Sequence, residues 1–229
     1  MKVRIKFRKY GILRFIGHLD VMRYFQKAMR RACIPIAFTG GYSPHMIMSF
    51  AQPLGIGLTS DGEYMDIELT ESIPSDRAVE ALNAVMTEGM EVVSFRQISD
   101  DKKSSGMTIV AAADYLVTVR GTDTVAAFWR EKLEDFLAQP SVLVMKKTKR
   151  SEKEMDIRPL IYQAAVTENG LFLKLAAGSA DNLKPDLVMD AFYDWAGMSR
   201  EPLHFHRLEL FARTEDGFIT LEDAGYAIR

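Results

Sequence analysis

The chain has 229 residues, of which 48% are hydrophobic and 26% are charged, a composition typical of a globular protein with one large domain or two small ones. No apolar run reaches the roughly 20 residues that span a bilayer, and the charged N-terminus lacks the apolar core of a signal peptide, so we expect a cytoplasmic protein. The single cysteine, Cys33, excludes an internal disulfide framework and most zinc sites, and we predict neither a metal site nor a cofactor.

The first half of the chain has the pattern of a β-α-β-β-α-β unit. Residues 3–7 alternate apolar and basic side chains, which indicates a half-buried strand, and a helix begins near His18 and ends before Pro35. The expected apolar stripe of this helix consists of Leu19, Met22, Phe25, Met29 and Cys33. Strands at 46–50, 63–70 and 90–98, with a helix that begins at Ser75 and ends at Gly89, complete a ferredoxin-like unit over residues 1–98.

The second half repeats this order after a polar linker, residues 99–106. The predicted strands are 115–120, 160–166, 171–176 and 205–212, and the predicted helices are 124–138 and 183–196. An inserted β-hairpin, 142–158, has a basic tip. The expected fold is therefore α+β, with two tandem ferredoxin-like (βαββαβ) units at 1–98 and 107–213, followed by a tail, 214–229, for which we predict no role.

The basic residues are unevenly distributed along the chain. Residues 1–50 contain ten basic side chains and one acidic side chain, a net charge of +9, so the other 179 residues must carry −11 to give the total of −2. This asymmetry predicts a surface that faces a polyanion. The candidate nucleic-acid or anion-binding residues are Arg23, Lys27, Arg30 and Arg31 on the helix, Gly40, Gly41 and Tyr42 in the following loop, and Lys147, Lys149 and Arg150 at the hairpin tip.

Simpler readings exist for the same residues. The helix face could be an ordinary solvated surface, and the basic residues of the first strand could pair with Asp66 and Glu68 across the sheet. No catalytic residue is identified. His18 and His45 are the candidates for proton transfer if the protein cleaves RNA, although a structural role is the favoured reading for both.

Several segments resemble the bacterial radical SAM-linked protein family, a domain of unknown function found beside or fused to radical SAM proteins. The segments that carry the resemblance are 13–20 (LRFIGHLD), 41–45 (GYSPH), 49–54 (SFAQPL), 147–150 (KTKR), 156–159 (DIRP) and 182–185 (NLKP). The family has no established activity, so the resemblance carries over no catalytic residue. It implies an accessory partner of a radical SAM protein that binds RNA or presents a substrate, in RNA or ribosome modification.

An alternative remains open. Two ferredoxin-like units with a glycine-rich loop are also similar to CRISPR repeat-processing endoribonucleases, which cleave RNA without a metal ion. Those enzymes carry the glycine-rich loop late in the second unit, whereas Gly40 and Gly41 lie in the first.

Overall fold

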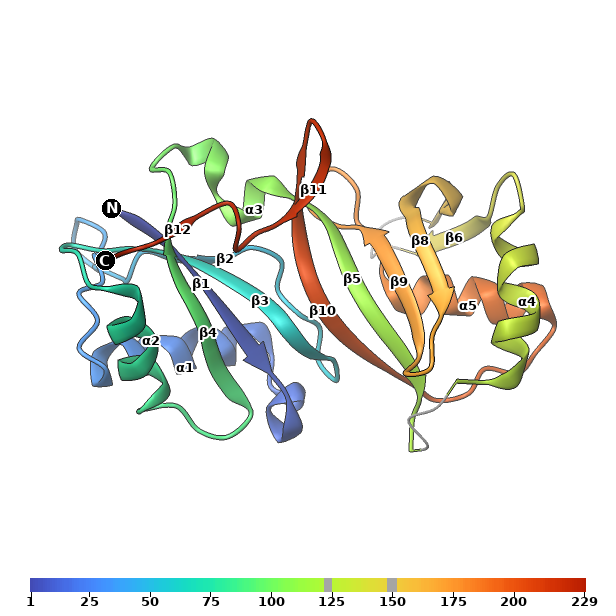
Figure 1. Cartoon of the computed structure of the whole chain (residues 1–229), viewed down its shortest axis with the longest axis horizontal. Coiled ribbons are helices and arrows are strands. Elements are labelled where there is room, and N and C mark those ends of the chain that lie inside the picture. The colour runs from blue at the N-terminus through green and yellow to red at the C-terminus, as the bar shows by residue number, and fades with distance from the viewer. Residues whose placement is uncertain (122–124, 148–151) are drawn as a thin grey trace. The chain divides into compact units, whose positions relative to one another are not determined.

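The computed structural model describes residues 1–121, 125–147 and 152–229, and its fold is α+β (Figure 1). The chain divides into two compact units: unit 1 comprises Met1–Ala111 and Arg207–Arg229, and unit 2 comprises Ala112–His206. These boundaries differ from the predicted ones, because residues 99–111 and the C-terminal residues belong to unit 1. In the described ranges, no helix is both long enough and apolar enough to cross a membrane.

Unit 1 is built on an antiparallel sheet. Four of its strands have the order β4-β1-β3-β2, with bounds β1 (Lys2–Lys9), β2 (Met48–Phe50), β3 (Thr59–Glu68) and β4 (Met90–Gln97). β2 pairs only with residues 65–67 of β3. β3 also pairs with β10 (Leu203–Thr214), and β10 pairs with β11 (Gly217–Thr220). Both neighbours of β1 run antiparallel to it, so its backbone is hydrogen-bonded on either side.

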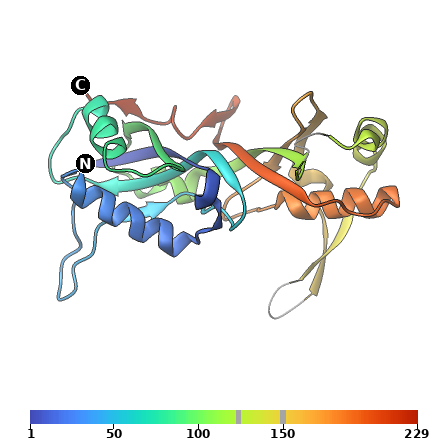
Figure 2. The same ribbon diagram turned by 90° about the horizontal axis from the view of Figure 1, so that it is seen from below.

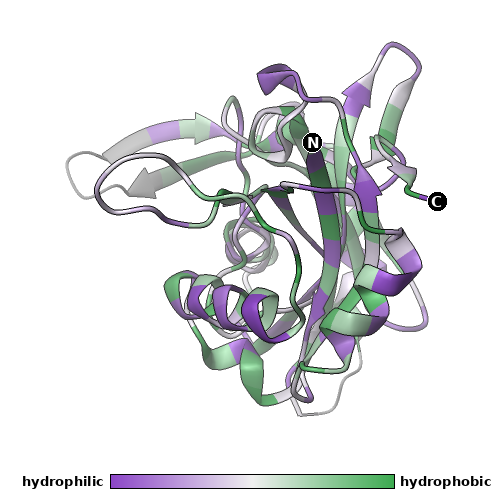
Figure 3. Ribbon diagram, turned by 90° about the vertical axis from the view of Figure 1, so that its left-hand side faces the viewer, coloured by the Kyte–Doolittle hydropathy of each residue, from purple (hydrophilic) through white to green (hydrophobic). Residues whose placement is uncertain are grey.

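One face of this sheet is apolar and packs on α1 (His18–Arg31) and α2 (Ser75–Asn83). The alternation in β1 is visible in Figure 3, and the core combines Val3, Ile5, Phe7, Val21, Phe25, Ala28, Met29, Met65, Ile67, Ala78 and Leu82. The predicted stripe of α1 is wrong at both ends. Leu19 is 60% exposed, and Cys33 is exposed because the helix ends at Arg31 and Cys33 has a positive φ of 53°. Val21 and Ala28 fill the core in their place.

The other face of the sheet is polar, and it is covered by segments that the sequence suggested were a linker and a tail. α3 (Gly106–Ile109) packs over β2 and β3, and the Ser104 carbonyl of η2 (Lys102–Ser104) accepts a hydrogen bond from Arg4 of β1. The C-terminal segment adds β12 (Tyr226–Ala227) to the edge of β4. Its Leu221 carbonyl accepts a hydrogen bond from Arg4, so this segment is an integral part of unit 1.

Unit 2 has the strand order β10-β5-β9-β8, and only residues 203–206 of β10 belong to it. The other bounds are β5 (Val110–Val119), β8 (Ile161–Val166), β9 (Leu171–Ala176), α4 (Ala127–Leu137) and α5 (Pro185–Ala196). Aromatic side chains join the two helices: the rings of Phe128 and Tyr193 lie 5.1 Å apart, and those of Phe136 and Phe192 lie 5.0 Å apart. The predicted insertion is confirmed as an antiparallel hairpin of β6 (Leu143–Lys147) and β7 (Glu152–Asp156).

Candidate functional site

The predicted basic residues of α1 lie on its solvent-exposed side. Arg23, Lys27, Arg30 and Arg31 are all exposed. Arg23 makes a long ion pair of 3.4 Å with Asp20, and Arg31 donates to the Val85 carbonyl. Within the described ranges, Lys27 and Arg30 have no hydrogen bond or ion pair. A surface ion pair of this kind is weak, so α1 offers a row of cations to a partner.

The basic residues of β1 do not contribute to that surface, because they are paired inside unit 1. Arg4 forms a bidentate pair with Asp66, with distances of 2.7 and 3.0 Å from Nε and Nη2, which confirms the cross-strand pairing expected from the sequence. Lys6 pairs instead with Glu209 at 2.6 Å and Glu222 at 3.3 Å. The positive charge of the first 50 residues is therefore exposed on α1 and is largely neutralised on β1.

The predicted glycine loop projects as a turn between two short paired segments, beyond the C-terminal end of α1 (Figure 2). The bridge between Phe38 and Met46 closes it, and Gly41 has a φ of 98°, a value that favours glycine. Tyr42 is fully exposed at its tip. The loop can therefore present an aromatic ring to a ligand without any rearrangement.

The two histidines have different surroundings. The ring of His18 packs edge-on against Phe50, at 4.9 Å between centroids, and burial lowers the pKa of His18. His45 has its Nδ1 3.1 Å from the hydroxyl of Thr39, in the loop that it closes. In the described part of the chain no hydrogen bond joins the two rings, so the structure does not assemble them into a catalytic pair.

The lowered pKa of His18 predicts a pH-dependent stability. The unfolded chain takes up a proton near the ordinary value of about 6.5, whereas folded His18 takes it up only at lower pH. The melting temperature should therefore fall as the pH decreases from about 7 to about 5. His18→Gln should reduce this decrease, and the matched variant His45→Gln should retain it. An identical pH profile for His18→Gln and the wild type would contradict the assignment.

A buried polar cluster, which the sequence did not reveal, lies beside His18. Lys9, Glu63 and Arg207 are each no more than 3% exposed. Arg207 Nη1 donates to Glu63 at 2.9 Å and to the Gln52 carbonyl at 2.7 Å, and Lys9 Nζ donates to the Ile16 carbonyl at 2.9 Å. Burial lowers the pKa of Lys9 and raises the pKa of Glu63. The cavity that Lys9 and Glu63 share with His18 is only about 10 Å³, the size of one water molecule, so the cluster is closed to a substrate.

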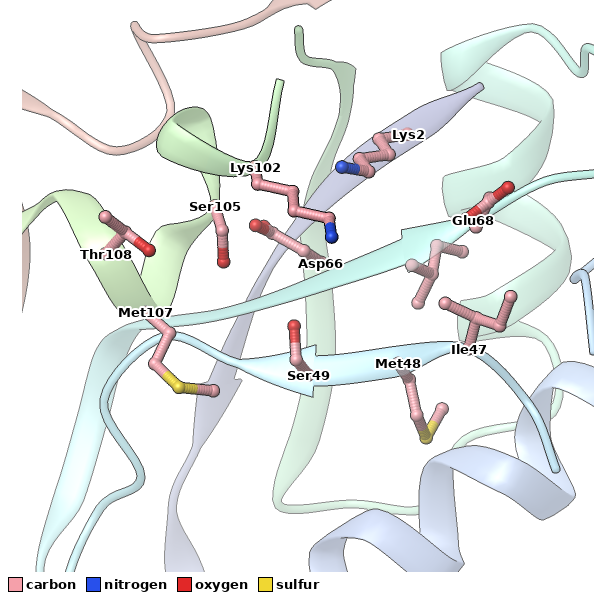
Figure 4. Close-up of a pocket in the computed structure, with 11 residues that line it drawn as sticks. Lys2, Ile47, Met48, Ser49, Asp66, Glu68, Lys102, Ser105, Met107 and Thr108 are labelled. Atoms are coloured by element: carbon pink, nitrogen blue, oxygen red, sulfur yellow. The ribbon is translucent and has the colours of Figure 1, made fainter. Parts of the chain in front are cut away.

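A larger pocket, of about 320 Å³, lies on the polar face of the unit 1 sheet (Figure 4). Its floor comes from β1, β2 and β3, and its wall comes from η2 and α3. The lining residues are Lys2, Ile47, Met48, Ser49, Asp66, Ile67, Glu68, Lys102, Ser105, Met107 and Thr108. Its volume lies at the lower end of the range for small-molecule sites.

The predicted basic tip of the hairpin is described only in part. Lys147 is the last residue of β6. Lys149 and Arg150 lie outside the described residues. In those parts of the chain that are described, no group of three or more His, Cys, Asp or Glu side chains is arranged to hold a metal ion.

Comparison with known proteins identifies the family of the chain. A family model described as "Uncharacterized protein conserved in bacteria (DUF2344)" matches residues 2–185, which is most of the chain. No curated protein matches the sequence. The family description names neither a reaction nor a partner.

Proposed function

The chain belongs to the family of uncharacterized proteins conserved in bacteria, DUF2344, and we propose that it is a cytoplasmic RNA-binding accessory protein that presents a substrate to a radical SAM protein. The partner in this proposal rests on the resemblance of the sequence motifs. The RNA rests on the exposed cations of α1, which are the observation that carries the proposal.

The spacing of these cations suits a phosphate backbone. Arg23, Lys27 and Arg30 follow one another at four and three residues, so they share one side of the helix and are about 6 and 4.5 Å apart along its axis. They are exposed, and Lys27 and Arg30 have no protein partner in the described ranges, so binding an anion would cost no internal ion pair. Electrostatic contacts of this kind supply most of the sequence-independent affinity for nucleic acids.

Exposed aromatic rings at the two ends of α1 favour a single strand over a duplex. Phe15, three residues before the helix, is 59% exposed, and the guanidinium of Arg14 lies 4.8 Å from its ring centre. Tyr42 is fully exposed in the loop that follows the helix. Unpaired bases stack on such rings, whereas the bases of a duplex are already stacked on one another. The proposed ligand is therefore single-stranded RNA.

Fluorescence anisotropy with a labelled, unstructured oligoribonucleotide tests this proposal. Lys27→Ala and Arg30→Ala should each weaken binding by about tenfold, the loss expected for one charge-assisted contact. Arg77→Ala removes another exposed cation, from α2, and should leave the affinity unchanged. Equal losses in all three variants, or no binding by the wild type at low salt, would contradict RNA recognition by α1.

Two further measurements concern the partner and the absence of cleavage. The native protein should co-purify with a radical SAM protein. If the purified native protein contained no radical SAM protein, that part of the proposal would be contradicted.

RNA incubated with the protein in EDTA should remain intact. Cleavage that is lost in His18→Ala or His45→Ala would favour the endoribonuclease reading instead.

We further propose that the two units are tandem copies of the ferredoxin-like βαββαβ unit. In support, unit 1 has the strand order β4-β1-β3-β2, and the corresponding strands of the second half have the order β10-β5-β9-β8. In both cases the first and third strands lie side by side in the centre and the last strand lies beside the first, with one helix after the first strand and one before the last.

A further inference from the structure

In the described part of the chain, several polar side chains of the pocket on the polar face of unit 1 make no hydrogen bond or ion pair. Lys102 is exposed, and its ammonium group has no partner in the described part of the chain. The hydroxyl groups of Ser49, Ser105 and Thr108 likewise make no hydrogen bond within the described ranges. These four groups are therefore available to a ligand, and they come from two segments that are about 50 residues apart in the sequence.

The ammonium groups of Lys2 and Lys102 point toward the same space above the sheet (Figure 4). Lys2 Nζ donates to the Asp100 carbonyl at 2.7 Å, which orients it and uses one of its three donors. The hydroxyl groups of Ser49 and Ser105 also line this space, with the Asp66 carboxylate drawn between Ser105 and the Lys102 ammonium group (Figure 4). Two ammonium groups and two hydroxyl groups therefore line the same pocket.

The carboxylates of the pocket do not cancel these cations. Both oxygens of Asp66 are engaged by Arg4, and Oδ2 also accepts the Gly106 amide at 2.7 Å. The carboxylate of Glu68 points away from the two ammonium groups (Figure 4). The space between Lys2 and Lys102 therefore favours an anion.

We propose that this pocket binds a small molecule that carries a phosphomonoester group. The phosphate, with a charge of about −1.5 to −2 at pH 7, lies between Lys2 and Lys102, and its oxygens accept hydrogen bonds from Ser49 and Ser105. The remainder of the molecule packs against the apolar side chains of Ile47 and Met107. The pocket contains no residue of α1, so this site is independent of the proposed RNA surface.

Phenyl phosphate is a suitable probe, because it combines a phosphomonoester with a compact apolar body. Its binding to the full chain can be measured by an NMR titration of the protein amides at pH 7.5. We expect shifts at residues 47–49 and 102–108, and weaker binding of phenyl sulfate, which has a single negative charge. Phenol, which has no anionic group at this pH, should not bind detectably.

The matched variants are Lys102→Met and Lys103→Met, which remove adjacent exposed cations from η2, of which only Lys102 lines the pocket. Lys102→Met should weaken phenyl phosphate binding by about tenfold, Ser105→Ala should weaken it by about threefold, and Lys103→Met should leave it unchanged. Equal weakening by Lys102→Met and Lys103→Met would indicate non-specific attraction and overturn the proposal. An unchanged affinity in Lys102→Met, or no shift in the wild type at millimolar phenyl phosphate, would overturn it as well.

Discussion

Replacing Arg4 by methionine should lower the free energy of unfolding by about 3–5 kcal/mol, the usual cost of removing one partner of a buried ion pair. Arg4 is only 2% exposed and bonds to three separate parts of unit 1. Its guanidinium pairs with Asp66 on β3, donates to the Ser104 carbonyl at 2.8 Å, and donates to the Leu221 carbonyl at 3.3 Å. The variant leaves the Asp66 carboxylate buried without its cation and releases both covering segments.

Chemical denaturation of the wild type and two variants measures this effect. Arg8→Met is the matched control, because Arg8 lies on the same strand but pairs with Glu91 through side chains that are each more than 40% exposed. An exposed pair contributes about 1 kcal/mol or less. If Arg4→Met and Arg8→Met lowered the stability equally, the Arg4–Asp66 pair would not organise the polar face.

The second large effect is expected for Phe25→Ala, which should cost about 3–5 kcal/mol because it leaves a cavity in the core. Phe25 is fully buried in α1, with its ring 4.7 Å from that of Phe7 and 6.3 Å from that of Phe50. The same substitution at Phe15, which is 59% exposed, should leave the stability nearly unchanged and weaken RNA binding instead.

Thermal unfolding and RNA anisotropy on the same two variants separate the roles of the two rings. Phe15→Ala should keep the wild-type melting temperature, and Phe25→Ala should melt well below it. A loss of stability in Phe15→Ala would show that this ring belongs to the core. Wild-type RNA affinity in Phe15→Ala would remove it from the proposed interface.

The sequence predicted the local features of unit 1 well, because those features depend on periodicity. Alternation in residues 3–7 identified β1, and the ferredoxin-like order, which places the first strand beside the third, allowed pairing of its basic residues with Asp66 and Glu68 to be expected; the Arg4–Asp66 contact is one such pair. The exposed basic side of α1 followed from helical spacing in the same way. The error at Cys33 arose because helical spacing was continued for two residues beyond the true end of the helix, Arg31.

The features that the sequence did not predict depend on contacts between distant residues. Lys6 pairs with Glu209, 203 positions away, and not with Asp66 or Glu68, the partners that the sequence suggested for the first strand. Residues 99–106 looked like a linker because they are polar, but they are polar because they cover the polar face of a sheet. The pocket beside Lys102 follows from that packing, and no local pattern could have indicated it.

The salt dependence of RNA affinity tests the central claim most directly. Each phosphate neutralised on a single strand contributes about −0.7 to the slope of log K against log salt, so engagement of all four α1 cations predicts a slope of roughly −3. The triple variant Arg23→Ala, Lys27→Ala, Arg30→Ala should have a slope smaller in magnitude by about 2, with an unchanged melting temperature. If the wild type and the triple variant gave the same slope, α1 would not be the surface that meets the RNA.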